Sequence, residues 1–124
     1  MKNFLNKRTQ GEYFEKLALN FLEKNNFTLL SKNFYCKYGE IDIIAQKEDL
    51  IIFVEVKQRS SLKFGNGLEA INFQKQRKIF LSAQYFLYKN HLENFNFRFD
   101  AITFDNNNQC EWIENIMRGD EIGF

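Results

Sequence analysis

The sequence is organised around Ile41–Lys57, which reads IDIIAQKEDLIIFVEVK. Two apolar runs flank a short polar tip, and this pattern predicts a β-hairpin. Each run carries one carboxylate, Asp42 in the first strand and Glu55 in the second. An ionised carboxylate among apolar strand residues is costly unless another group neutralises it. Both acids therefore need a specific partner.

The register of this hairpin decides where the two acids lie. With Glu48–Asp49 as a two-residue tip, antiparallel pairing places Asp42 opposite Glu55 and Glu40 opposite Lys57. Carboxylates that face each other across two strands, with Cβ atoms about 4.5–5.5 Å apart, repel. A divalent cation between them reverses the sign of that interaction, and Mg²⁺ prefers such oxygen ligands. The hairpin therefore predicts part of a metal site with an ammonium group beside it.

The residue types at this site favour one kind of chemistry. We expect Mg²⁺ or Mn²⁺ to bind Asp42, Glu55 and the backbone carbonyl oxygen of Val56. Lys57 follows on the same face of the strand, where it can orient or help to deprotonate the attacking water, or neutralise charge on a phosphoryl oxygen. The pattern predicts phosphodiester hydrolysis. Because the sequence contains one histidine, a Ser-His-Asp hydrolase triad is a poor explanation.

Length and composition indicate one globular domain over residues 1–124, with a loosely ordered tail from about residue 118. Hydrophobic residues make up 44% of the chain, enough for a packed core. The longest apolar run, Leu50–Val54, is far shorter than the roughly 20 residues of a membrane helix. Cys36 and Cys110 lack the spacing of a zinc site. We expect a cytoplasmic protein with no membrane partner.

Apolar periodicity places the remaining elements. In chain order we expect a helix over Gln10–Asn25 capped by Thr9, an extended segment over Phe27–Lys37, a turn at Tyr38–Gly39, the hairpin, a basic loop over Gln58–Gly67, a helix from Leu68 or Ile71 to Lys89, and strands over Phe97–Phe104 and Cys110–Ile116. The second helix is a natural crossover between two strands. The predicted fold class is α/β, a mixed sheet of about five strands flanked by helices, in the order α-β-β-β-α-β-β.

The first predicted helix carries two acids near its start, Glu12 and Glu15. At 100° per residue, Glu15 falls at the edge of the apolar stripe beside Leu22, whereas Glu12 falls on the polar side. Glu15 is therefore the candidate that points toward the sheet and holds a water at the site. The alternative, a solvated glutamate favoured by the helix dipole, stays open.

Basic residues gather just after the hairpin. Between Lys57 and Lys78 the chain has six basic residues and one acid, Glu69. Such a window beside the acids predicts contact with nucleic-acid phosphates. The expected contacts are Arg59, Lys63, Lys75, Arg77 and Lys78. The alternative is that these charges are merely solvated.

Several motifs resemble one bacterial family. Residues 39–45 (GEIDIIA), 53–59 (FVEVKQR), 64–65 (FG) and 69–71 (EAI), together with Lys75, look like the YraN family of uncharacterised, endonuclease-like proteins. The acid, gap and Glu55-Val56-Lys57 resemble the PD-(D/E)XK nuclease signature. The family's helix-one glutamate matches Glu15, since Ala18, Phe21 and Leu22 follow at the family's spacing, and Glu12 does not match.

The resemblance implies a restriction-endonuclease-like fold similar to archaeal Holliday junction resolvases. It further implies a metal-dependent endonuclease that acts on branched or structured DNA, and a homodimer by analogy. Phe14 stands where the family usually has glycine, and Gln58 where it usually has a small hydroxyl residue. Both departures bear on how a substrate sits.

Two other functions remain open at this stage. The first is a nuclease-fold module that binds nucleic acid or a protein without cutting. Such a module keeps the basic window and gains nothing from Asp42. The second is a structural role in which Glu40 and Lys57 form a cross-strand ion pair.

Overall fold

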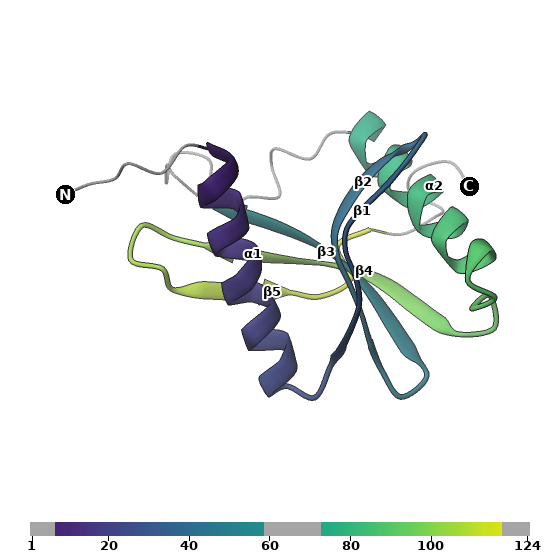
Figure 1. The fold of residues 1–124 in the computed structure, drawn as a ribbon, viewed down its shortest axis with the longest axis horizontal. Helices are drawn as coiled ribbons and strands as arrows, with labels where there is room; N and C mark the ends of the chain where they lie inside the picture. The colour runs from purple at the N-terminus through teal and green to yellow at the C-terminus, as the bar shows by residue number, and fades with distance from the viewer. Residues whose placement is uncertain (1–6, 59–72, 118–124) are drawn as a thin grey trace.

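The computed structural model describes residues 7–58 and 73–117. Its elements are α1 (Lys7–Lys24), β1 (Thr28–Cys36), β2 (Gly39–Lys47), β3 (Leu50–Gln58), α2 (Phe73–Lys89), β4 (Asn96–Phe104) and β5 (Cys110–Ile113). The five strands form one sheet in the order β1-β2-β3-β4-β5 (Figure 1). The predicted element order and the mixed five-stranded sheet flanked by helices are confirmed. The predicted basic loop, from Arg59 on, and the tail from residue 118 lie outside the described residues.

The strands pair as the connections demand. β1, β2 and β3 form an antiparallel meander, whereas β3 and β4 are parallel because α2 crosses over between them. β5 returns antiparallel to β4. Neither helix, within the part of the chain that the structure describes, is long and apolar enough to cross a membrane.

The hairpin tip is the predicted pair Glu48–Asp49, because Lys47 and Leu50 are the last partners in the ladder. Glu48 adopts a positive φ of 55°, a conformation that usually favours glycine or asparagine. The start of β4 supports this tip. The Asn96 N–H donates to the Asp49 carbonyl at 3.0 Å, and the Asn96 side chain donates to the Asp49 carboxylate at 3.1 Å.

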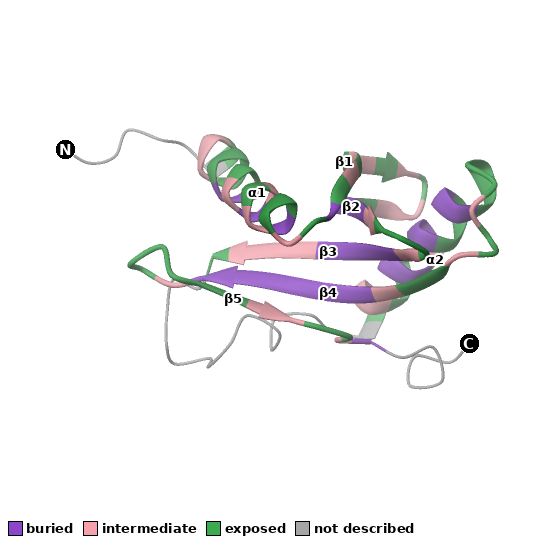
Figure 2. Ribbon diagram, turned by 90° about the horizontal axis from the view of Figure 1, so that it is seen from below, coloured by how far each residue is buried: buried purple, intermediate pink, exposed green. Residues whose placement is uncertain are grey.

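Each face of the sheet packs against one helix (Figure 2). Alternate β3 residues divide between two apolar clusters, as the period of two requires. The α2-side cluster includes Ile51, Phe53, Ile79, Ala83, Phe86, Leu87 and Phe99. The α1-side cluster includes Phe14, Ala18, Leu22, Ile52, Val54, Ile102 and Phe104. The apolar stripe predicted for the first helix beside Leu22 is confirmed.

Three local predictions were wrong. The first helix begins at Lys7, so Thr9 lies inside its first turn and is no cap. The β1–β2 turn is one residue earlier than expected, because Gly39 already belongs to β2. The last strand ends at Ile113, since Asn115 has a positive φ of 59°, which breaks the extended backbone.

The feature that positions the site is a fork between β2 and β3. Their ladder ends at the pair Ile43–Val54, while β2 continues beside β1 as far as Gly39. The side-chain alternation breaks there, because Ile41 packs on the α2 side whereas Ile43 packs on the α1 side. Figure 1 shows β2 curving away from β3 toward α2. Asp42 stands at the apex of this fork.

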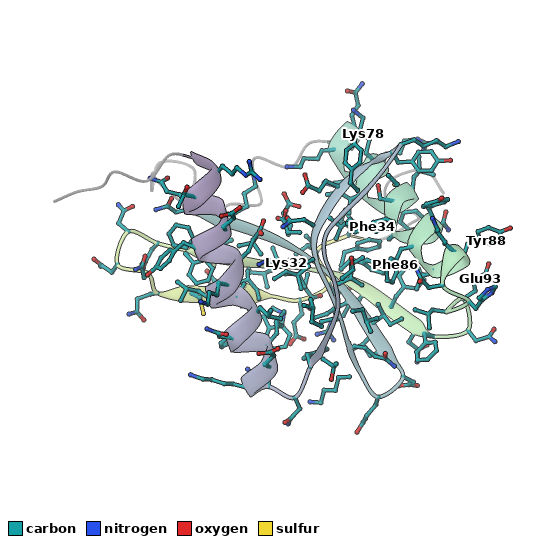
Figure 3. All side chains as sticks on the ribbon, in the orientation of Figure 1. Lys32, Phe34, Lys78, Phe86, Tyr88 and Glu93 are labelled. Atoms are coloured by element: carbon teal, nitrogen blue, oxygen red, sulfur yellow. The ribbon has the colours of Figure 1, made fainter. Side chains whose placement is uncertain are left out.

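Contacts with α2 hold the curved β1–β2 hairpin in place. Phe34 of β1 and Phe86 of α2 meet edge to face, with ring centroids 5.1 Å apart (Figure 3). Near the hairpin turn, the Cys36 Sγ lies 3.5 Å from the Ser82 Oγ, which itself donates to the Lys78 carbonyl at 2.9 Å. The fork thus follows from packing between elements distant in sequence.

Candidate acidic site at the strand fork

Asp42 is fixed at the fork by a backbone hydrogen bond. The Val56 N–H lies just beyond the last pair of the β2–β3 ladder and donates to the Asp42 Oδ2 at 2.9 Å. A buried N–H needs an acceptor, and the carboxylate replaces the carbonyl that the departing strand no longer offers. This bond holds Asp42 near Glu55, although the two residues do not form the ladder pair that the predicted register implies.

Within the described part of the chain, the surroundings of Asp42 disfavour its ionised form. Burial raises the pKa of this carboxyl from 3.8 to about 7, and the negative charge of Glu55 adds to the increase. The hydrogen bond from Val56 opposes the shift, while Glu15 and Glu40 raise the pKa further. A cation placed among these acids would favour the ionised form of Asp42.

The Glu55 carboxylate forms an ion pair with the ammonium group of Lys75 on α2. The Lys75 Nζ lies 3.0 Å from the Glu55 Oε2, and the Glu55 side chain is only 14% exposed. Both groups line a cavity of about 290 Å³ in the fork. The residues that line this cavity are Gly39, Glu40, Asp42, Glu55, Lys75, Lys78 and Ile79.

Glu15 faces the sheet, as the helical pattern predicts. Its Oε1 accepts a hydrogen bond from the Asn33 Nδ2 of β1 at 3.1 Å. Burial raises the pKa of Glu15, while Asn33 and Lys32 oppose the shift. Glu12 instead lies on the exposed helix surface, 3.6 Å from the guanidinium of Arg8. The predicted orientations of the two glutamates are therefore confirmed.

A second cavity, of about 380 Å³, lies on the α1 side of the fork. It is lined by Arg8, Gly11, Glu12, Glu15, Asn33 and Glu40. Glu40 belongs to the lining of both cavities, so the two cavities are neighbours. The negative charges of Glu15 and Glu40 both raise the pKa of Asp42.

The predicted pairing of Glu40 with Lys57 was wrong as well. Glu40 and Lys57 are not partners, because the β2–β3 ladder ends at Ile43–Val54 and Glu40 pairs with Tyr35 on β1. Lys57 is half-buried on β3, two residues beyond Glu55. Its role in attack by water stays a prediction, as does that of the Val56 carbonyl.

The residues predicted to contact nucleic acid differ in their exposure and in whether the structure describes them. Lys78 and Arg77 are exposed near the start of α2, and Figure 3 shows Lys78 beside the β1–β2 hairpin. Lys75 is half-buried and contacts Glu55. Arg59 and Lys63 lie outside the described residues.

The partnership of Lys75 with Glu55 was missed from the sequence, although a signal for it exists. Lys75 comes one helical turn before Ile79, a member of the buried stripe of α2. Residues four apart share a helix face, so Lys75 points to the sheet. The pattern alone leaves open which strand residue it reaches.

The residues at the fork fit a hard divalent ion. Asp42 and Glu55 supply carboxylate oxygens, and Mg²⁺ commonly needs only one or two such ligands, with waters and phosphate oxygens completing its shell. Among residues 7–58 and 73–117, no three acidic, histidine or cysteine side chains are grouped closely enough to form a complete protein cage. An ion held by these two carboxylates would take the rest of its coordination shell from water and phosphate oxygens.

The fold and the site describe an α/β protein with a mixed sheet, in which two acids, Asp42 and Glu55, lie where β2 separates from β3. The chain belongs to the uncharacterised protein family UPF0102, whose family model matches residues 14–104. UPF0102 is the YraN family that the sequence motifs resemble, so this resemblance is confirmed. The matched segment contains Glu15, Asp42, Glu55, Lys57 and Lys75.

Curated relatives cover nearly the whole chain. A UPF0102 protein of Clostridioides difficile is 48% identical over 98 residues, which are 79% of this chain and 86% of the relative. One from Clostridium acetobutylicum is 47% identical over 119 residues, 92% of this chain and 97% of the relative. One from Fusobacterium nucleatum is 39% identical over 120 residues, 97% of this chain and 100% of the relative.

Proposed function

We propose that this protein is a divalent-metal-dependent endonuclease that hydrolyses phosphodiester bonds in DNA, with branched or otherwise structured DNA as its substrate. The observation that carries the proposal is the placement of Asp42 beside Glu55 in one cavity, where the pKa of Asp42 is raised to about 7. Two acids held together at such a cost in electrostatic energy suit a cation site. The predicted homodimer and cytoplasmic location are part of this proposal.

The roles follow from the geometry. Asp42 and Glu55 would hold Mg²⁺ or Mn²⁺, and the Val56 carbonyl is the predicted further ligand. The bound ion would neutralise charge on the phosphoryl group and favour attack by water. The Val56 N–H keeps Asp42 in place through its 2.9 Å hydrogen bond. Lys57 is proposed to orient the water or to neutralise the phosphoryl oxygen, and Glu15 to hold a water nearby.

Basic side chains at the start of α2 support phosphate binding next to the acids. Lys75 and Lys78 line the fork cavity, and Arg77 is exposed on the same turns of the helix. Lysine and arginine near an acidic pair bring the DNA backbone to a site that would otherwise repel it. Arg59 and Lys63 stay predicted contacts.

Cleavage of defined DNA tests the proposal. The purified protein is incubated with branched, nicked and single-stranded DNA in Mn²⁺ or Mg²⁺, beside Asp42→Asn, Lys57→Ala and the control Glu93→Gln. Glu93 is exposed just beyond α2 (Figure 3). We expect cleavage by the parent and the control, and loss of cleavage in Asp42→Asn and Lys57→Ala. Equal cleavage by all four proteins would indicate a contaminating nuclease and contradict the proposal.

A second candidate function is DNA binding without cleavage. The contact that favours it is the 3.0 Å ion pair between Lys75 and Glu55, which neutralises one acid without a metal. In that case DNA binding persists in EDTA and in Asp42→Asn, and none of the DNA substrates is cut. The same set of proteins, tested by gel shift as well as by cleavage, separates the two functions.

A further inference from the structure

The ion pair between Lys75 and Glu55 joins two elements that are distant in sequence. Lys75 comes from the first turns of α2, and Glu55 lies on β3 where the fork opens. The Nζ to Oε2 distance is 3.0 Å, and the side chains are 41% and 14% exposed respectively. Both residues line the fork cavity together with Asp42. The ammonium therefore lies on the wall of this cavity beside Glu55.

This position has a direct consequence for any other cation. A carboxylate that accepts a short bond from an ammonium has fewer lone pairs and less negative potential to offer an ion. Within the described residues Asp42 does not share this compensation, because the Val56 N–H donates to it and the strongest charged influence on its pKa is the negative charge of Glu55. A divalent ion that binds both acids must therefore displace Lys75 from Glu55 or share Glu55 with it.

We propose that Lys75 is a positioning residue that stands in for the divalent ion in the metal-free protein. It holds the Glu55 carboxylate in the fork and competes with the ion for it, so Lys75 sets the concentration of ion at which the site fills. Lysine suits this role because its flexible stem can leave one oxygen and remain on the cavity wall. The inference rests on the metal site of the proposed function.

The chain offers a matched control on the same helix. Lys78 lies three residues further along α2, lines the same cavity and carries the same charge. It is exposed, so solvent screens its effect on an ion more strongly. Lys75→Met and Lys78→Met remove equal charge and retain similar apolar stems, and only the first removes the contact with Glu55. Lys75→Arg keeps a cation that can pair with Glu55.

Calorimetric titration of the full-length protein with Mn²⁺, without DNA, measures the competition. We expect Lys75→Met to bind Mn²⁺ about tenfold more tightly than the parent, and Lys78→Met to differ by roughly twofold or less. Lys75→Arg should stay close to the parent. Thermal unfolding of each variant, with and without Mn²⁺, checks the fold, and Mn²⁺ should raise the melting temperature of Lys75→Met most. If Lys75→Met does not fold, Lys75→Gln takes its place with the same expectation.

The outcomes keep the inference separate from the nuclease proposal. Tighter Mn²⁺ binding in Lys75→Met without DNA cleavage by the parent supports the role of Lys75 and contradicts the nuclease. Cleavage by the parent together with equal Mn²⁺ affinity in Lys75→Met and the parent contradicts the role of Lys75 and leaves the nuclease intact. An equal gain in Lys75→Met and Lys78→Met also overturns the inference, because it indicates net charge alone. Failure of the parent to bind Mn²⁺ overturns both.

Discussion

Asp42 and Asp100 are both acids in apolar strands, and their surroundings differ in an informative way. Asp100 on β4 is fully buried and accepts bonds from the Arg98 guanidinium at 3.0–3.2 Å, from the Trp112 indole N–H at 2.9 Å and from the Asn115 N–H at 2.9 Å. Asp42 receives one N–H and has Glu55 as its neighbour. Within residues 7–58 and 73–117, Asp100 has partners for both of its carboxylate oxygens, whereas Asp42 forms no ion pair.

The comparison of Asp100 with Asp42 shows how an acid that stabilises the fold differs from an acid that is suited to bind a ligand. The bonds to Asp100 connect β4, β5 and the segment after β5, and they explain why the chain turns at Asn115. A fully satisfied buried carboxylate stabilises the fold. An acid that is incompletely satisfied lowers stability in the absence of a ligand, and selection for function is the reason to keep it.

The largest expected effect compares isosteric changes at the two acids. Asp100→Asn puts an NH₂ group or a single neutral oxygen against the Arg98 and Trp112 donors, so we expect a loss of about 3 kcal/mol or more in the free energy of unfolding. Asp42→Asn keeps an acceptor for the Val56 N–H and removes an unfavourable charge, so it should be neutral or stabilising at pH 8 without metal. Urea unfolding measures both. Equal losses at the two positions would contradict the distinction.

The second effect is the pH dependence of stability in the metal-free protein. The folded-state pKa of Asp42, about 7, lies above the ordinary value of 3.8, so the folded protein binds this proton more tightly than the unfolded chain. Stability therefore falls as pH rises from about 4 to about 7, by at most about 4 kcal/mol from this group.

Asp42→Asn should remove most of that decrease, and unfolding curves across this pH range for the parent and the variant test the sign. Glu93→Gln, at an exposed position beyond α2, serves as a control for charge removal. A parent protein that gains stability across the same interval would show that the acids of the fork are already compensated.

The sequence predicted the hairpin because its information is local. Apolar alternation over Ile41–Lys57 fixes the two faces, and a two-residue tip then fixes the register that brings Asp42 to Glu55. The fork could not be predicted in this way, since it depends on packing of the β1–β2 hairpin against α2 through Phe34 and Phe86. The false Glu40–Lys57 pairing came from extending a regular ladder past that fork.

The cation that pairs with Glu55 could not be predicted from the sequence either. Lys57 has the sequence spacing of a same-face neighbour, and Arg98 and Asp100 show that such spacing does produce an ion pair elsewhere in the sheet. At Glu55 the cation within 3.0 Å instead comes from α2. Helix periodicity indicates that Lys75 faces the sheet, but the strand residue it meets is set by the crossover geometry.

A smaller effect concerns the bond between Asn33 and Glu15, which joins α1 to β1 beside the fork. Asn33 has a positive φ of 54°, so Asn33→Ala loses both this 3.1 Å bond and a residue type that tolerates the conformation. We expect a loss of about 1–2 kcal/mol in the free energy of unfolding. Asn33→Gly keeps the conformation and should lose less. Equal losses in the two variants would assign the effect to the hydrogen bond alone.

The smallest expected effect on the free energy of unfolding comes from substitutions of the two glutamates of α1, Glu12 and Glu15. Burial raises the pKa of Glu15, so Glu15→Gln should stabilise the metal-free protein slightly above neutral pH, in the same direction as Asp42→Asn and by less. Glu12 is exposed and meets Arg8 at 3.6 Å, and the loss of such a surface pair in Glu12→Gln changes the free energy of unfolding by less than about 0.5 kcal/mol. Urea unfolding at pH 8 with and without Mn²⁺ separates the two, because only Glu15 borders the acids of the fork closely enough to influence the pKa of Asp42. If Mn²⁺ stabilises Glu12→Gln and Glu15→Gln to the same extent as the parent, the influence of α1 on the site is negligible and the fork acids act alone.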